Sequence, residues 1–187
     1  MSAGAGAIPM RFLRSSYDRR METRYGAPVV ADEKTTLEGM LDHYRALLLE
    51  TCSGLSDEQL RRSVVPSGIT LLGIIKHLSF VERGWFQEKV GNEALVLPFD
   101  PESDPDGDWR IEGNETTEDI LEMYRFSIRE SHKVMAQRSL DDLVEFPKRR
   151  GYSVRWVLAH MLEETARHAG HADILRELID GKTGAGY

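Results

Sequence analysis

The stretch SVRWVLAHMLEETARHAGHADILRELI, residues 153–179, decides the fold of this chain. It opens with Ser153, a residue type that caps helix N-termini well, and Gly181 lies just beyond its end. Apolar residues such as Val157 and Met161 recur along it at helical spacing. The stretch therefore predicts one long helix that buries one side.

Apolar residues also recur at helical spacing in three earlier segments, at about residues 35–52, 70–90 and 117–138. The first begins at a capping box, Thr35-x-x-Glu38, and ends before Gly54; a short capped turn at residues 56–59 follows it. No convincing strand alternation appears. Four helices with three connections predict an all-α fold, an antiparallel four-helix bundle with a long crossover between helices two and three.

The 187 residues include 24 Lys plus Arg and 31 Asp plus Glu, which gives a net charge of −7. A chain of this length is expected to form one domain. Most of the negative charge lies in residues 91–122, where eleven acidic residues face one basic residue, Arg110. We interpret this region as the crossover running into the third helix, a solvated connection that can also form one rim of a site.

Several function classes are disfavoured by composition. Phosphate binding needs a basic face, so nucleic acid is not an expected partner. No apolar run approaches the ~18 residues of a membrane span. Cys52 is the only cysteine, which excludes an internal disulfide and a cysteine-based zinc site. A cytoplasmic protein fits these features, and any metal must be held by His and carboxylate side chains.

The start of the chain differs from the rest. It carries five arginines within residues 1–32 but lacks the apolar central region of a secretory signal. We expect residues 1–32 to form an N-terminal extension that is loose or docks on another surface, and residues 33–187 to form the bundle.

Chemistry-bearing side chains gather on one stripe of the helix over 153–179. At ~100° per residue, His160, Glu164, Arg167, His168 and His171 share about a quarter of its circumference, on a side that should face the bundle. Glu and His four residues apart can bind one ion from a single helical turn, with a further ligand from a facing helix. The alternatives are an ordinary exposed pair for Glu164 and His168, and a hydrogen bond near the core edge for His160.

His77, in the middle of the second helix, is the candidate for the facing ligand, although a lone histidine there can also be a satisfied core residue. Gly73 and Gly84 lie on its side of the helix. Glycine inside a helix costs about 0.5–1 kcal/mol, so two of them indicate a need for space or close approach. That space can hold a ligand or admit another helix.

Two motifs, LLGIIKHL at residues 71–78 and HMLEETARHAGH at residues 160–171, resemble the DinB-like superfamily of four-helix metalloproteins, and in particular its actinobacterial branch related to mycothiol-dependent enzymes. The resemblance covers about residues 33–180. It implies a divalent metal, zinc or else nickel, held by His77, Glu164 and His168. His171 stands where many relatives have glutamine, so His171 and Arg167 remain candidates for contacts to a ligand residue or to substrate.

The resemblance further implies a metal-dependent enzyme that moves a low-molecular-weight thiol, such as mycothiol, onto a small electrophile. A metal-dependent hydrolase and a thiol-assisted isomerase are alternatives from the same site, and a non-catalytic metal-binding or stress-response bundle is another. Two imidazoles and one carboxylate leave a divalent ion with net charge +1 and open positions, which is typical of catalytic sites. Cys52 lies outside both motifs, so a thiol must come from a cosubstrate. Relatives are often dimers, which suggests a homodimer.

Overall fold

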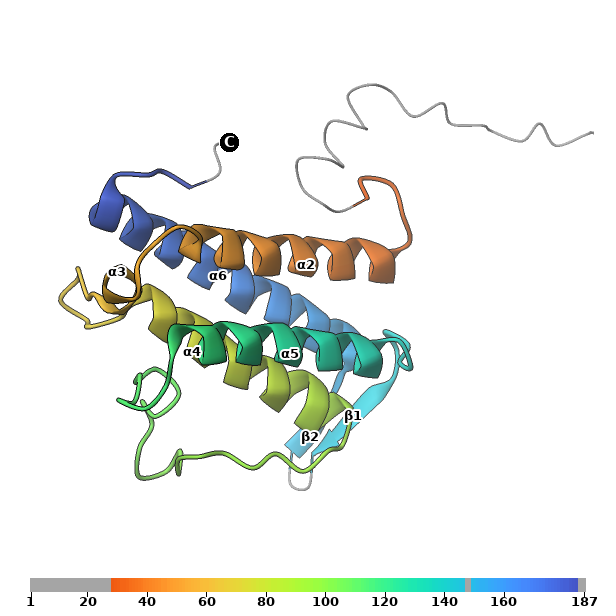
Figure 1. Ribbon diagram of the computed structural model, residues 1–187. Coiled ribbons are helices and arrows are strands. Elements are labelled where there is room, and N and C mark those ends of the chain that lie inside the picture. Colours follow the sequence, from red (N-terminus) through yellow and green to blue (C-terminus); the bar gives the residue numbers. More distant parts are fainter. Residues whose placement is uncertain (1–27, 147–148, 185–187) are drawn as a thin grey trace, which may run out of the picture.

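The protein is mostly helical, with one small two-stranded sheet (Figure 1). The computed structural model describes residues 28–146 and 149–184, so most of the predicted extension, residues 1–32, lies outside the described residues. The elements in chain order are α2 (Glu33–Cys52), α3 (Asp57–Arg61), α4 (Leu71–Glu82), η1 (Arg83–Val90), α5 (Thr117–Met135), β1 (Leu143–Phe146), β2 (Arg149–Ser153) and α6 (Val154–Asp180).

The long helices pack in pairs, α2 mainly on α6 and α4 mainly on α5. The colours of Figure 1 show that α4 and α5 run in one direction, whereas α2 and α6 run in the other. An ion pair of 2.8 Å between Arg155 and Glu33 joins the starts of α6 and α2. Because α4 and α5 run in the same direction, the connecting segment between them, residues 91–116, returns along the length of the molecule before α5 begins.

Local signals set most helix ends. Ser153 caps α6 by accepting a hydrogen bond from the Trp156 backbone, and Gly181 ends the helix in the left-handed conformation at φ 78°. The short capped turn predicted at residues 56–59 is the start of α3, where Ser56 forms a capping box with Gln59. The capping box predicted at Thr35 is wrong, because Asp32 caps α2 and accepts a hydrogen bond from the Thr35 backbone.

Two features depart from the predicted helices. The sequence shows no strand pattern, yet β1 and β2 form an antiparallel hairpin in which Val144 pairs with Tyr152. Strands of four and five residues are too short to show a clear alternation. The predicted second helix is helical throughout, but its last eight residues form the π-helix η1, where the Gly91 amide donates to the Phe86 carbonyl at 2.8 Å. Such wide turns are rare and often mark functional sites.

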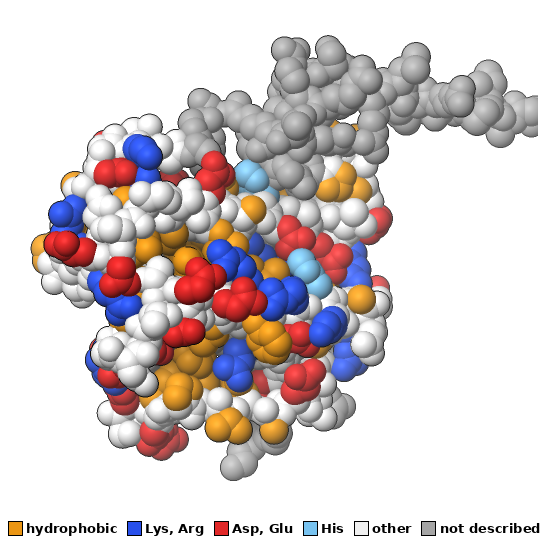
Figure 2. Space-filling view, in the orientation of Figure 1, with side chains coloured by type: hydrophobic (Ala, Val, Ile, Leu, Met, Phe, Trp, Pro, Cys, Tyr) orange, Lys and Arg blue, Asp and Glu red, His pale blue; other side chains and the backbone are white. Residues whose placement is uncertain are grey.

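The core has two apolar clusters, and α6 contributes to both. Ala172 and Leu175 belong to one, and Val157 and Met161 to the other. The polar turn that contains Glu164 lies between these two parts of α6. Within the described residues, no helix is long and apolar enough to cross a membrane. Charged side chains of both signs are intermixed on the face formed by α2 and α5 (Figure 2).

Candidate metal centre

His77 from α4 meets Glu164 and His168 from α6. One ligand atom from each of the three side chains lies within 4.8 Å of the other two. Glu164 Oε1 is 3.5 Å from His77 Nε2 and 3.1 Å from His168 Nε2. The side chains are 13%, 21% and 8% exposed for His77, Glu164 and His168. We call these three residues the His–Glu–His cluster.

The connecting segment holds the His77 ring in place. Nδ1 of His77 lies 2.7 Å from Oδ2 of Asp108. The indole of Trp109 stacks on the imidazole, with ring centroids 3.9 Å apart and 13° between the planes. Sequence reasoning missed both residues as members of the site, although the acidic crossover was expected as one rim of it.

Gly73 is the reason the connecting segment can come so close. A Cβ atom at Gly73 would lie 2.9 Å from the Trp109 carbonyl oxygen, closer than side chains normally approach. Gly84 differs, because a Cβ there would meet only Lys89 Nζ, at 3.6 Å. The sequence left two explanations open for Gly73, space for a ligand or the close approach of another segment. Close approach is correct, and the segment that approaches is a loop and not a helix.

A buried lysine fixes the same segment. The Lys76 side chain, 3% exposed, donates to the Arg110 carbonyl at 2.6 Å and to Glu115 Oε2 at 2.7 Å. Lys76 precedes His77 on α4, and Arg110 follows Trp109 on the segment. The contacts to His77 and the contacts to Lys76 thus tie one short piece of the connecting segment to one turn of α4.

The donor atoms of the cluster fit a divalent ion. A carboxylate oxygen can only accept, so Nδ1 of His77 donates to Asp108, and in the neutral form of the ring Nε2 is left with its lone pair. That Nε2 is buried and has no hydrogen-bond partner among the described residues. Buried polar atoms without a partner are costly and usually have a reason. A carboxylate that holds the far nitrogen of a histidine is the usual support of a metal ligand.

The electrostatics favour charged Glu164 and neutral His168. Burial alone would raise the pKa of Glu164, but the neighbouring His168 and His77 outweigh it, and the pKa is lowered. Burial lowers the pKa of His168, and the neighbouring His77 lowers it further, against the opposing pull of Glu164. Carboxylate and neutral imidazole are the forms in which these side chains bind metals.

The other predicted residues of the stripe lie around the cluster. Nδ1 of His171 is 3.4 Å from Nδ1 of His168, so His171 is placed to orient that ring. Arg167 is exposed, and no hydrogen bond or ion pair joins it to another described residue. His160 is not part of the cluster: its ring stacks on Trp156, with centroids 5.1 Å apart.

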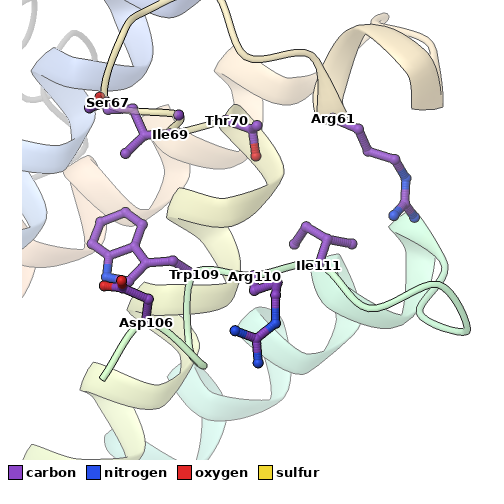
Figure 3. Close-up of a pocket in the computed structure, with 9 residues that line it drawn as sticks. Arg61, Ser67, Ile69, Thr70, Asp106, Trp109, Arg110 and Ile111 are labelled. Carbon is purple, nitrogen blue, oxygen red and sulfur yellow. The ribbon is translucent and has the colours of Figure 1, made fainter. Parts of the chain in front are cut away.

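A cavity of about 530 Å³ opens on the Trp109 side of the site (Figure 3). Its wall is formed by the end of α3, the loop before α4 and the connecting segment, through Arg61, Ser67, Gly68, Ile69, Thr70, Asp106, Trp109, Arg110 and Ile111. Both arginines already have carboxylate partners, Asp57 for Arg61 and Asp104 for Arg110. Trp109 borders both this cavity and the His–Glu–His cluster.

A comparison with known protein families gives a match for this chain. The chain matches the family described as Mycothiol-S-transferase over residues 36–181. It belongs to this family. The Mycothiol-S-transferase family is of the DinB/YfiT-like type, so the resemblance identified from the two motifs is confirmed. No curated protein gives a match.

The match to the Mycothiol-S-transferase family spans the whole site. Residues 36–181 include both motifs and the connecting segment with Asp108 and Trp109. They also include Cys52, which is buried at the end of α2. Burial raises the pKa of the Cys52 thiol to about 12, against a smaller opposing effect of Arg176. Cys52 is therefore protonated and enclosed at neutral pH, which does not suit a nucleophile.

Proposed function

We propose that the protein transfers a low-molecular-weight thiol, mycothiol, to a small electrophile, with a divalent metal held by His77, Glu164 and His168. The observation that carries the proposal is the buried, unpartnered Nε2 of His77, which faces Glu164 while Asp108 holds the other ring nitrogen. Membership of the Mycothiol-S-transferase family supports the thiol and the reaction class.

The donor set favours zinc, with nickel as the alternative, because two imidazoles and one carboxylate suit either ion. When bound, the ion acts as a Lewis acid that lowers the pKa of an incoming thiol and so favours its thiolate form at neutral pH. Three protein ligands leave room for such a thiol. The protein supplies no thiol of its own at this site, since Cys52 is buried elsewhere.

The reaction itself is a substitution at carbon. The thiol sulfur forms a C–S bond, the leaving group departs with the electron pair of its bond to carbon, and the thiol proton goes to solvent. Asp108 and His171 orient the rings of His77 and His168, and Trp109 covers one face of the His77 ring. Arg167, exposed on the same helix, is placed to contact an anionic part of a substrate.

The remaining sequence-based predictions are part of the same proposal. These are a DinB-like four-helix bundle over residues 33–187, antiparallel between its two pairs of helices and with its crossover at the connecting segment, a cytoplasmic location and a homodimer. A metal-dependent hydrolase, a thiol-assisted isomerase and a non-catalytic metal-binding bundle are the competing functions, and the assay below separates them.

The experiment measures thiol conjugation by the full-length protein after its metal content is known. Monochlorobimane is offered with mycothiol, bacillithiol or glutathione, and the fluorescent conjugate is followed. We expect conjugation with mycothiol, loss of metal and activity in His77→Ala, and retention of both in His132→Ala, a matched histidine on α5 outside the cluster. Stoichiometric metal without consumption of any thiol would overturn transfer. Ester hydrolysis without thiol would then favour the hydrolase.

A further inference from the structure

The cavity of Figure 3 adjoins the metal centre through one residue, Trp109. The indole is part of the cavity wall, and its ring centroid lies 3.9 Å from that of His77 and 5.3 Å from that of His168. Thr70, also in the wall, caps α4 and precedes His77 by seven residues, or about 10 Å along the helix axis. A molecule that fills the cavity and touches Trp109 would therefore reach the metal centre with a short flexible arm.

Both arginines of the cavity wall already have their charge balanced. Arg61 Nε donates to the two carboxylate oxygens of Asp57, at 2.9 Å and 3.0 Å. Arg110 donates two hydrogen bonds to Asp104, at 3.0 Å and 2.6 Å, and one to Glu112, at 2.8 Å. Each guanidinium keeps N–H groups that can donate further, since it carries five. The cavity therefore offers donors, but its cations are already paired with carboxylates.

Two exposed polar groups of the wall are open to a ligand. The side chains of Asp106 and Ser67 form no hydrogen bond or ion pair with another described residue. The carboxylate of Asp106 can only accept hydrogen bonds, whereas the Ser67 hydroxyl can donate and accept. Ile69 and Ile111 add apolar surface next to Trp109. The wall thus combines donors, acceptors and apolar surface, and its free charge is negative.

We infer that this cavity binds the body of the thiol cosubstrate, and that this body is an uncharged polyol. Hydroxyl groups donate and accept, so they match Asp106, Ser67 and the remaining arginine N–H groups, while the C–H faces of a sugar ring pack on the apolar wall. A volume of about 530 Å³ is in the usual range for small-molecule sites. The inference deepens the proposed function and rests on it for the reaction. Mycothiol has this chemistry, because its cysteine is linked to an amino sugar joined to inositol.

The charges of the cavity also select among thiols. Glutathione and bacillithiol each carry two carboxylates, whereas mycothiol carries none. Carboxylates brought into this cavity would meet the like charge of Asp106 and arginines that are already paired, which costs affinity. We therefore expect kcat/KM to favour mycothiol over either anionic thiol by about tenfold or more.

The first test removes the free carboxylate. Wild-type protein and Asp106→Ala are assayed with monochlorobimane and either mycothiol or N-acetylcysteamine, an uncharged thiol without a polyol. We expect Asp106→Ala to raise KM for mycothiol about fivefold, with kcat and both constants for N-acetylcysteamine changed less than about twofold. Asp106→Lys, which reverses the charge, should lower the preference for mycothiol over glutathione about tenfold. Glu102→Ala, at an exposed acidic residue of the same segment outside the cavity wall, is the matched control.

A binding measurement separates this inference from the proposed function. N-acetylglucosaminyl-inositol, the polyol body without a thiol, is titrated against metal-loaded protein in a calorimeter. Binding that weakens in Asp106→Ala but not in Glu102→Ala supports the cavity, even if no thiol is ever consumed. Conjugation with equal KM for mycothiol in wild type and Asp106→Ala overturns the cavity as the thiol site and leaves the transferase intact. Tighter binding of glutathione than of the polyol would indicate an anion site and would also overturn the inference.

Discussion

Two of the buried clusters of ionisable side chains among the described residues are built in opposite ways. Glu82, at the end of α4, receives two hydrogen bonds from Arg45 of α2, at 2.8 Å and 2.6 Å, and one from Ser131 of α5, at 2.7 Å. The side chains of Arg45 and Glu82 are 5% and 1% exposed. Donors and acceptors are paired in these residues, which we call the Arg45–Glu82 cluster, so no ligand is needed to satisfy them. In the His–Glu–His cluster, by contrast, the buried His77 Nε2 faces the Glu164 carboxylate at 3.5 Å and has no hydrogen-bond partner among the described residues.

The difference shows how a structural ion pair can be told from a binding site. Burial alone would lower the pKa of Arg45, but the adjacent Glu82 outweighs it and raises the pKa, so Arg45 stays charged. The Nε2 atom of His77 has no such donor opposite it. Removal of a residue from the first cluster should therefore affect folding, whereas removal from the second should affect ligand binding.

The largest effect is expected for Glu82→Gln. This change removes the buried counter-charge of the Arg45 guanidinium and leaves only the half-exposed Asp42, 2.8 Å away, which should cost about 3 kcal/mol in the free energy of unfolding. Urea denaturation of metal-free protein measures the loss. The double variant Arg45→Met with Glu82→Leu should recover most of it, because both charges are removed together. A loss below about 1 kcal/mol for Glu82→Gln would show that the Arg45–Glu82 cluster is not a structural pair.

The second effect concerns zinc. At a free zinc concentration a hundredfold above Kd, binding should raise the free energy of unfolding of the wild type by about 2.7 kcal/mol. His168→Ala should show no such gain, while its metal-free stability stays close to that of the wild type. Denaturation with and without zinc, together with metal analysis by mass spectrometry, provides both numbers. Equal stabilisation of His168→Ala would place the ion elsewhere.

A smaller effect is expected at Asp108, which contacts the proposed ligand His77 and would not contact a bound ion itself. Asp108→Asn keeps the shape of the side chain but weakens its hold on His77 Nδ1, and should lower zinc affinity about 10–100-fold. Competition with a chelating dye measures this affinity. Asp106→Asn, in the same segment but turned to the cavity of Figure 3, is the control and should bind zinc as the wild type does.

Part of the candidate site could be predicted from the sequence, and part of it could not. Helical periodicity alone puts Glu164 and His168 on one side of α6. The position of His77 in the middle of the second helix makes it the candidate that faces them, and the family resemblance implies the same residue. Asp108 and Trp109 lie in a segment without periodicity, and their place depends on tertiary contacts such as the bond from Lys76 to the Arg110 carbonyl. No local pattern encodes such a contact.

The same reasoning applies to the fold. The ends of α6 follow from Ser153 and Gly181, which act through their own backbone neighbours. The π-helix η1 could not be predicted, because eight residues show no clear difference between helical periods. The Arg45–Glu82 cluster also went unnoticed, since its members come from three helices and are far apart in sequence. The spacing of charged residues along a helix does not indicate whether their side chains will be buried.

The smallest effect is a contrast between two glycines that share the His77 side of the helix. Alanine is favoured over glycine inside a helix by about 1 kcal/mol, so Gly84→Ala, which meets only the flexible end of Lys89, should stabilise the protein by up to that amount. Gly73→Ala should lose this gain, because its Cβ would press on the Trp109 carbonyl and push the connecting segment outward. Only Gly73→Ala should also weaken zinc binding, since Asp108 moves with that segment. If both variants were equally stable and bound zinc equally well, the close approach at Gly73 would not be what holds Asp108 against His77.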